Sequence, residues 1–392
     1  MATLRTSVLG IDFENPFILS SAPPTAKIES IDKAFTLGWG GAVLKTITPD
    51  DLEMIEASQR YASWKSAGRV CGFENIELLS HLTIRQWLDG IKFLRQKHPN
   101  KVQIASIMAP VVKEEWQNLV KTFNNAEIDA FELNFSCPHG MPEKGIGMAI
   151  GTNPEIAAMI TEWVKEVAKK PVFVKLSPNV TDITEIVKAV EKAGADGFAA
   201  INTVQSLMGV DLDTFEPMPK VNGESTFGGY SGMAVKPIGL RCVAQIRQTS
   251  DLPILGMGGV SSWRDAAEYM TVGADVVQVC TEVMINGYQV IKQMNQGLLS
   301  YLESKGFNSP ADLKNKAIDK LTAHKALNKS KQVYPHIDDV ACVKCGKCVM
   351  VCDECEHSAL SLENGHIVVN HDNCVGCSLC SHACPKSAIT MK

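Results

Sequence analysis

Residues 342–352, CVKCGKCVMVC, and residues 374–384, CVGCSLCSHAC, repeat one cysteine spacing, CxxCxxCxxxC. Three cysteines within seven residues can hold one corner of a 4Fe-4S cluster, and the fourth cysteine of each run can ligate the other cluster. The repeat therefore predicts two 4Fe-4S clusters with crossed ligand sets. One set is Cys342, Cys345, Cys348 and Cys384, and the other is Cys374, Cys377, Cys380 and Cys352.

Zinc sites and disulfides explain this spacing less well. Zinc sites use pairs of CxxC with a longer spacer, and they need neither the third nor the fourth cysteine of each run. Disulfide frameworks belong to exported proteins, and the N-terminus MATLRTSVLG has no signal-peptide pattern. Pro385 gives the second run the usual Cys-Pro ending, whereas Asp353 follows Cys352 in the first run. Cys355 has no place in either set, and we expect it to be structural.

Composition places the chain among ordinary soluble proteins. Its net charge is -5 with acidic and basic residues interleaved, so nothing indicates binding to nucleic acid or to an acidic membrane surface. No apolar run approaches the roughly 20 residues that span a bilayer. Thirteen cysteines without an export signal indicate the reducing cytoplasm.

Short apolar runs alternate with longer amphipathic segments before the cysteine-rich tail. The predicted strands are residues 17–20, 41–46, 102–108, 130–137, 171–177, 197–203, 253–259 and 276–281. Predicted helices include residues 155–169 and 183–193. Eight alternating strands and helices predict an α/β protein with a (β/α)8 TIM barrel, and a doubly wound sheet is the alternative.

The predicted organisation has three parts. The barrel covers residues 1–304, a lysine-rich helical connector covers residues 305–334, and a two-cluster ferredoxin-like domain covers residues 335–392. The N-terminal part is long enough to bury a large core of its own.

Polar residues gather where the predicted strands end, which is where such barrels carry their active sites. Two lysines and two asparagines at neighbouring strand ends suit a flavin ring, because its carbonyls and nitrogens need donors and its reduced anion is stabilised by positive charge. One lysine alone would be explained as a solvated side chain, but the whole set favours a site. Glycines at positions 228, 229, 232, 258 and 259 would let backbone amides approach a phosphate.

Ten segments, in order along the chain, resemble the FMN and iron-sulfur part of dihydropyrimidine dehydrogenase. They are GIDFENPFILSSA, GWGGAVLKT, IASIM, ELNFSCPHG, KLSPNVTDI, INTV, GGYSG, KPIGLR, GMGG and VVQVCT, followed by the double cysteine run. The resemblance covers essentially the whole chain, and in bacteria that part is a separate subunit. Dihydroorotate dehydrogenases share the barrel motifs but lack the tail.

The resemblance implies the residues of the site. FMN would be held by Ser20, Ser21, Lys45, Thr46, Asn134, Lys175, Asn202, Thr203, Gly232, Gly259, Cys280 and Thr281. Asn134, Ser136, Asn202 and Thr203 would contact the pyrimidine, and Cys137 would be the proton donor. A thiol titrates near enough to neutrality to act as a general acid. Residues 138–151, PHGMPEKGIGMAIG, show neither a helical nor a strand period and should form a mobile lid that carries Cys137.

One position departs from the family pattern. After IASIM the pyrimidine enzymes have an asparagine that binds both flavin and substrate, and the matching residue here is Val112. A valine side chain cannot hydrogen-bond an amide edge, so either the loop takes a shifted alignment or the substrate differs.

No GxGxxG fingerprint follows a predicted strand, because GIGMAIG and GMGGVS lack the spacing or the helix opening. We therefore expect the nicotinamide to bind a separate iron-sulfur partner subunit that resembles the FAD and NAD(P)H part of the family, in a dimer or hetero-oligomer. The clusters would pass single electrons between the two flavins.

The leading hypothesis is a catalytic subunit that interconverts uracil or thymine and the 5,6-dihydropyrimidine. A related reductase of another cyclic enone, enamide or enoate is a second hypothesis, which Val112 favours. A third is an electron-transfer subunit whose barrel only holds flavin, but such a carrier would need neither Cys137 nor a lid.

Overall fold

The computed structural model describes residues 2–52, 57–77, 79–135 and 147–392. Contacts divide the chain into two compact units, Met1–Lys320 and Leu321–Lys392, and the division falls inside the segment 305–334 that we predicted as a connector. Within the described residues, no helix combines the length and apolar composition that a membrane span requires.

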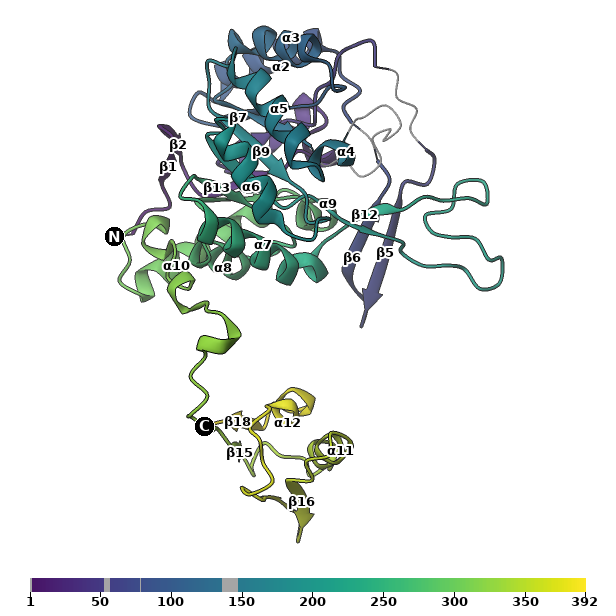
Figure 1. Cartoon of the computed structure of the whole chain (residues 1–392), viewed down its shortest axis with the longest axis vertical. Coiled ribbons are helices and arrows are strands. Elements are labelled where there is room, and N and C mark those ends of the chain that lie inside the picture. Colours follow the sequence, from purple (N-terminus) through teal and green to yellow (C-terminus); the bar gives the residue numbers. More distant parts are fainter. Residues whose placement is uncertain (1, 53–56, 78, 136–146) are drawn as a thin grey trace. The chain divides into compact units, whose positions relative to one another are not determined.

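The first unit is a closed barrel of eight parallel strands (Figure 1). In order around the barrel they are β3 (Phe17–Leu19), β4 (Gly41–Val43), β7 (Val102–Ile107), β8 (Ala130–Asn134), β9 (Val172–Leu176), β10 (Gly197–Ala200), β13 (Ile254–Gly256) and β14 (Val276–Val279). The ring closes where Val277 of β14 pairs with Phe17 of β3. The TIM-barrel prediction is confirmed and the doubly wound alternative is wrong. Each strand lies inside its predicted range, and all eight end before the last residue predicted for them.

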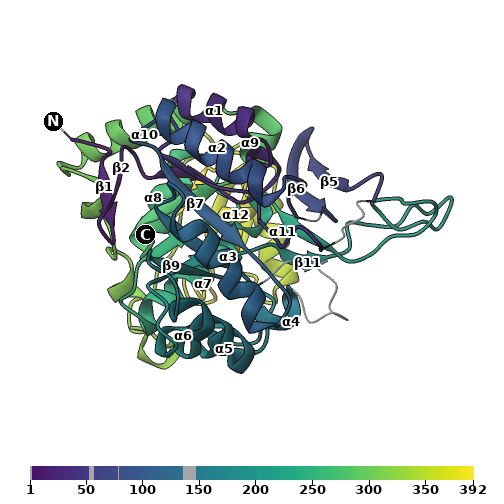
Figure 2. The ribbon, with the colours of Figure 1, turned by 90° about the horizontal axis from the view of Figure 1, so that it is seen from above.

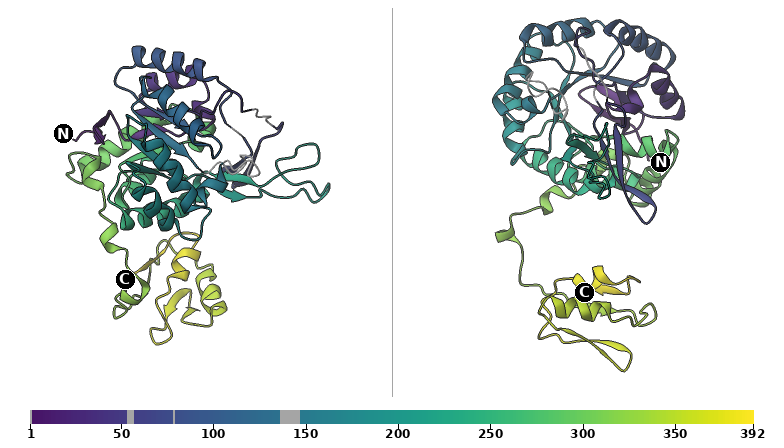
Figure 3. Two further views of the ribbon diagram at one scale, coloured as in Figure 1. Left: turned by 45° about the horizontal axis from the view of Figure 1, so that its top comes forward. Right: turned by 90° about the vertical axis from the view of Figure 1, so that its right-hand side faces the viewer.

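Eight helices follow the eight strands and form the outer ring seen in Figures 2 and 3. They are α1 (Ile28–Leu37), α2 (Ile84–Lys97), α3 (Lys113–Asn124), α5 (Pro154–Lys165), α6 (Ile183–Lys192), α7 (Lys236–Thr249), α8 (Trp263–Thr271) and α10 (Val290–Ser304). In α6, Ile183, Ile186, Val187 and Val190 are buried at the spacing of one helix face. Asp182 caps this helix by accepting from the Thr184 amide.

Apolar side chains from all eight strands fill the barrel. Ile18, Val43, Ile104, Ala130, Phe173, Ala199, Leu255 and Val276 belong to one buried cluster. Val8 and Phe13 of the N-terminal hairpin, β1 (Thr6–Val8) and β2 (Ile11–Phe13), join the same cluster. The hairpin therefore covers the end of the barrel where the strands begin, and the opposite end is left for a site.

A second sheet was not predicted. It has the order β11 (Val204–Ser206), β12 (Gly228–Ser231), β6 (Arg69–Asn75) and β5 (Tyr61–Ser66), and all its pairs are antiparallel. Ala67 and Gly68 join β5 to β6 with φ values of 49° and 77°, as a two-residue hairpin turn with positive φ at both positions requires. The segments come after β4 and after β10, so the sheet lies at the C-terminal end of the barrel and projects from it (Figure 1).

The second unit is small and contains two antiparallel strand pairs. β15 (Pro335–Ile337) pairs with β18 (Ile389–Met391), and β16 (Leu360–Glu363) pairs with β17 (His366–Val369). α11 (Lys347–Glu354) and α12 (Leu379–Ala383) complete it. Its buried core consists of Cys348, Leu360, Ile367, Cys380 and Ile389.

Candidate active site and cysteine hollows

A cavity of about 1250 Å³, which includes its open mouth, lies at the C-terminal ends of the barrel strands. All twelve residues that the resemblance assigns to FMN line this cavity, although the ligand itself stays a prediction. They are Ser20, Ser21, Lys45, Thr46, Asn134, Lys175, Asn202, Thr203, Gly232, Gly259, Cys280 and Thr281.

Thr46 is the centre of a hydrogen-bond network that joins several strand ends. Its Oγ1 atom lies 3.1 Å from Ser21 Oγ and 3.0 Å from Ser106 Oγ, and it accepts a 2.9 Å bond from Asn134 Nδ2. Asn202 Nδ2 in turn donates to Asn134 Oδ1 at 3.4 Å. The two asparagines are therefore held in position by the protein itself, which fixes the donors and acceptors that they present to the cavity.

Both lysines are nearly buried and each is paired with one carboxylate. Lys45 Nζ lies 3.3 Å from Glu77 Oε1, and Lys175 Nζ lies 3.4 Å from Glu132 Oε1. Glu132 is fully buried, and its Oε2 accepts a 2.8 Å bond from Gln278 Nε2. Buried charges are tolerated when they are paired in this way. The pairing keeps the two lysine side chains in the cavity wall.

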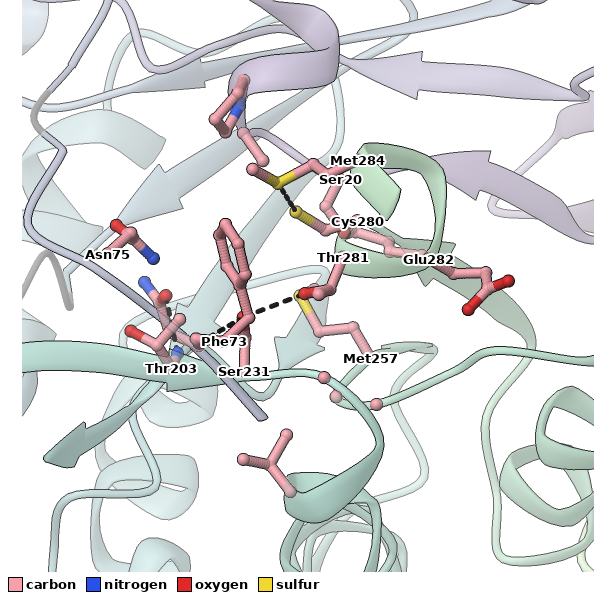
Figure 4. Close-up of a pocket in the computed structure, with 18 of the residues that line it drawn as sticks. Ser20, Phe73, Asn75, Thr203, Ser231, Met257, Cys280, Thr281, Glu282 and Met284 are labelled. Carbon is pink, nitrogen blue, oxygen red and sulfur yellow. Dashed lines mark hydrogen bonds between the residues drawn. The ribbon is translucent and has the colours of Figure 1, made fainter. Parts of the chain in front are cut away.

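Cys280 and Thr281 also line the cavity, and Figure 4 shows them across from Asn75 and Thr203. Cys280 Sγ donates to Met284 Sδ at 3.7 Å, and Thr281 Oγ1 donates to Ser231 Oγ at 2.9 Å. Burial raises the pKa of the Cys280 thiol to about 11, although the nearby Lys175 and Lys45 act in the opposite direction. Cys280 is therefore a neutral thiol near pH 7 and is suited to packing against a ligand rather than to nucleophilic attack.

Three glycines form a narrow cradle beside the start of α7. Gly232, Gly258 and Gly259 have φ values of 89°, 121° and 70°, which favour glycine. A Cβ at Gly259 would lie 2.6 Å from the Gly232 oxygen and 2.8 Å from the Lys236 nitrogen. Backbone amides at the start of a helix are suited to a phosphate.

Gly228 and Gly229 have a different role from the one we expected. Both lie in β12 and neither lines the cavity. A Cβ at Gly228 would lie 2.2 Å from Glu74 Oε1, and one at Gly229 would lie 2.4 Å from Thr203 Oγ1. These glycines allow close approach between the second sheet and its surroundings, so the expectation that they approach a phosphate is wrong.

Several lining residues were missed by sequence reasoning. They are Tyr61, Phe73, Asn75, Glu77, Tyr230, Ser231, Met257 and Gln278. Most lie in or next to the unpredicted sheet, and Figure 4 shows Phe73 and Asn75 at the cavity. The signal in the sequence was the hairpin YASWKSAGRVCGFEN, in which a small-residue turn separates two runs containing aromatic or β-branched residues. Tyr61 donates to Glu77, so this sheet also supports the carboxylate that pairs with Lys45.

Ser136, Cys137 and most of the predicted lid lie outside the described residues. The last four lid residues form α4 (Met148–Gly151), so the expectation of irregular structure is wrong for that end. Val112 precedes α3 as its N-cap residue, is 41% exposed, and is not among the residues that line the cavity.

Two hollows in the second unit gather the eight cysteines. One hollow of about 330 Å³ is lined by Cys342, Cys345, Cys348 and Cys384, and the other, of about 370 Å³, is lined by Cys352, Cys374, Cys377 and Cys380. This is the crossed grouping that the spacing predicts. Cys355, which we expected to lie outside both sets, also lines the second hollow.

The fourth cysteine of each run is held by a backbone amide. Ala359 N donates to Cys352 Sγ at 3.4 Å, and Ala388 N donates to Cys384 Sγ at 3.3 Å. Hydrogen bonds from backbone amides to sulfur are a feature of cluster-binding thiolates. Among the described side chains, no three His, Cys, Asp or Glu residues converge tightly enough to hold a single metal ion. The cysteines instead line two hollows, an arrangement that suits iron-sulfur clusters better than single metal ions.

Comparison with known proteins identifies both units. A family model described as dihydroorotate dehydrogenase matches residues 3–302, and one described as a 4Fe-4S dicluster domain matches residues 335–391. The chain is 37% identical to the NAD-dependent dihydropyrimidine dehydrogenase subunit PreA of Escherichia coli (strain K12) over 396 residues, which covers 99% of this chain and 95% of that protein.

The chain is also similar to two further proteins. The chain is 36% identical to the chloroplastic dihydropyrimidine dehydrogenase (NADP(+)) of Arabidopsis thaliana, over 84% of this chain and 80% of the relative. It is also 36% identical to the catalytic subunit of dihydroorotate dehydrogenase B (NAD(+)) of Pyrococcus furiosus, over 79% of this chain and 97% of the relative. These matches confirm the resemblance drawn from the motifs. The chain therefore belongs to the dihydroorotate dehydrogenase family of barrel oxidoreductases and, with its 4Fe-4S dicluster domain, is a dihydropyrimidine dehydrogenase-like catalytic subunit.

Proposed function

We propose that this chain interconverts uracil or thymine and the corresponding 5,6-dihydropyrimidine, with FMN in the barrel cavity and two 4Fe-4S clusters in the second unit. One observation carries the proposal: a single cavity brings together two buried lysines, two oriented asparagines and a glycine cradle. It does so in a chain whose relatives are named dihydropyrimidine dehydrogenases.

The cavity residues fit FMN by their chemistry. Lys45 and Lys175 would face the ring carbonyls, where positive charge stabilises a reduced anionic ring. Gly232 and Gly259, at the start of α7, would offer amides to the phosphate. When bound, FMN supplies hydride transfer to or from the substrate.

The chain's own groups would bind the substrate and move its proton. Asn134 and Asn202 carry amides that match the amide edges of a pyrimidine, and their mutual hydrogen bond fixes which atoms are presented. Ser136 and Thr203 would add hydroxyl contacts. Cys137 would give a proton to the ring carbon that does not receive the hydride, and would take it back in the reverse direction. A lid formed from residues 138–151 would exclude water during this step.

The two cysteine hollows would hold the clusters that carry single electrons to and from the barrel. An NAD(P)H-oxidising partner subunit with FAD would supply those electrons, because no dinucleotide fingerprint is present in the sequence. The subunit wording in the name of the Escherichia coli relative supports such a hetero-oligomer. The chain would be cytoplasmic, because its thirteen cysteines would be protected there from forming disulfides.

A related reductase of another cyclic enone, enamide or enoate is the second candidate. Val112 favours it, because it stands where the pyrimidine enzymes have asparagine. The position of Val112 outside the cavity lining weakens this support.

A single experiment separates the candidates. The holoenzyme is reduced anaerobically, then mixed with uracil, thymine, orotate and a panel of cyclic enones, and flavin reoxidation is followed by absorbance. Rapid reoxidation by uracil or thymine with formation of the dihydropyrimidine supports the proposal. Reoxidation only by another compound would transfer the function to that substrate class.

A further inference from the structure

The second unit is built from two copies of one backbone pattern, so equivalent positions around the two hollows can be compared. Cys342 N donates to Asp338 O at 2.9 Å, and Cys374 N donates to Asn370 O at 3.1 Å. Gly346 and Ser378, which precede α11 and α12, share φ 69° and ψ 0°. The fourth cysteine of each run accepts an amide from an alanine, as described above.

Charges at equivalent positions differ between the copies. The first run carries Lys344 and Lys347 where the second run has Gly376 and Leu379. Because ligation crosses over, the segment after Cys384 also belongs to the first hollow, and Lys386 lines it. Three lysines therefore stand in the segments that build the hollow of Cys342, Cys345, Cys348 and Cys384. Asp338 and Asp339 oppose them there, and Glu363 lies in the hairpin whose Ile367 lines the same hollow.

The connections next to the other hollow are more acidic. Two lysines also stand beside it, since Lys331 precedes Gln332, which donates to the Cys374 carbonyl, and Lys392 follows Met391, which lines the hollow. Ala359 lies seven residues after Cys352, whereas Ala388 lies four residues after Cys384. The longer connection, DECEHS, contributes three carboxylates, which are Asp353, Glu354 and Glu356. Asp372 adds a fourth, and no lysine or arginine occurs in residues 353–358 or 370–384. Cys355 and His357 of the longer connection line the hollow itself, so the acidic loop is adjacent to it.

We infer that the two clusters have unequal reduction potentials, and that the cluster held by Cys342, Cys345, Cys348 and Cys384 is reduced first. Reduction adds one electron to a cluster, so nearby positive charge stabilises the reduced form and nearby negative charge destabilises it. The inference rests on the cluster content proposed above. It assigns Lys344, Lys347 and Lys386 on one side, and the carboxylates of the longer connection on the other, as the residues that set the order of electron filling.

The expected size follows from Coulomb's law. One exposed charge roughly 8 Å from a cluster changes the equilibrium constant for reduction by about two- to threefold at the dielectric constant of water. A net difference of about two to three charges between the two sites should therefore separate the equilibrium constants for reduction of the two clusters by about five- to tenfold. The separation should shrink as salt is added, because exposed charges are screened.

The test is an anaerobic redox titration of the full-length holoprotein with dithionite as electron donor, followed by low-temperature EPR. The double variant Glu354→Gln/Glu356→Gln should raise the equilibrium constant for reduction of the less readily reduced cluster about fivefold. It should leave that of the other cluster unchanged. Lys344→Gln/Lys347→Gln should make the more readily reduced cluster harder to reduce by a similar factor. Glu162→Gln, on the exposed face of α5, removes a carboxylate from the barrel and should shift neither.

The outcomes are separable from those of the proposed function. Iron and acid-labile sulfide are measured first, and their absence would remove the cluster content on which both proposals rest. Two clusters that titrate together in the wild type, or charge variants that shift the opposite cluster, would overturn the inference while leaving the dehydrogenase proposal intact. Selective shifts of the two reduction midpoints in the stated directions would support the inference.

Discussion

Lys175 Nζ lies 3.4 Å from Oε1 of Glu132, and both side chains are almost completely buried beneath the candidate flavin cavity. The second carboxylate oxygen of Glu132 accepts a hydrogen bond from Gln278, so the carboxylate joins β8, β9 and β14. The pair places a positive charge in the wall of the cavity and balances it from within the barrel.

Replacing Glu132 with glutamine should lower the free energy of unfolding by about 3 kcal/mol or more, because it leaves the Lys175 ammonium buried without its carboxylate. Chemical denaturation of the cofactor-free protein measures the change. The double variant Glu132→Gln/Lys175→Met removes both charges and should recover part of the loss. A single variant as stable as the wild type would show that the pair is not important for stability.

Thr46→Val should cost about 1–3 kcal/mol of stability, since it removes the hydroxyl that accepts a hydrogen bond from the buried Asn134 amide. It should also weaken binding of flavin or substrate, because Asn134 loses its fixed orientation. Thr122→Val is a matched control, because that hydroxyl donates to the Asn118 carbonyl on the exposed face of α3. Equal effects of the two substitutions would contradict the role given to Thr46.

Cys280 should resist alkylation at pH 7.5 in the cofactor-free protein and react faster only as the pH approaches its raised pKa of about 11. Peptide mapping after timed treatment with iodoacetamide measures the rate, with a free thiol of ordinary pKa, about 8.5, as reference. Because the folded protein retains this proton to higher pH than the unfolded chain, the thiol should also reduce stability as the pH rises from about 9 to 11. Rapid alkylation near neutrality would show that the thiol is not shielded.

Cys137→Ala should leave FMN bound and reducible, yet slow the steady-state reaction by about 10²-fold or more, the usual scale for loss of a general acid. Anaerobic photoreduction checks the flavin, and turnover with uracil checks the chemistry. Unimpaired turnover would assign the proton donor elsewhere, with Ser136 as the next candidate.

Val112→Asn should stabilise the protein by up to about 1 kcal/mol, because asparagine is a much better N-cap than valine and this position has extended backbone with no side-chain cap. A polar side chain carries little penalty here, because the position is 41% exposed. Thermal and chemical denaturation measure the cap. Uracil turnover of the same variant shows whether the added amide also helps a pyrimidine.

Much of this protein is specified by local pattern. The eight barrel strands were predictable because buried parallel strands are short apolar runs and because helices such as α6 repeat apolar residues at 3.6-residue spacing. The two cysteine groups were predictable because cluster ligation fixes a strict spacing within each run. The cavity lining was also predictable in part, since parallel strands bring their C-terminal ends together and so unite Lys45, Asn134 and Lys175.

What only the tertiary structure decided depends on contacts between distant parts of the chain. Ser231 donates to the Phe73 carbonyl across 158 residues, and the sheet that contains both adds Phe73, Asn75 and Ser231 to the cavity. Gly228 is needed because Glu74 packs against it, not because a ligand does. Glu132 becomes the partner of Lys175 only when β8 and β9 lie side by side. Periodicity and motif spacing indicate which face of a helix or strand is buried. Packing of the whole barrel determines which side chain that face contacts.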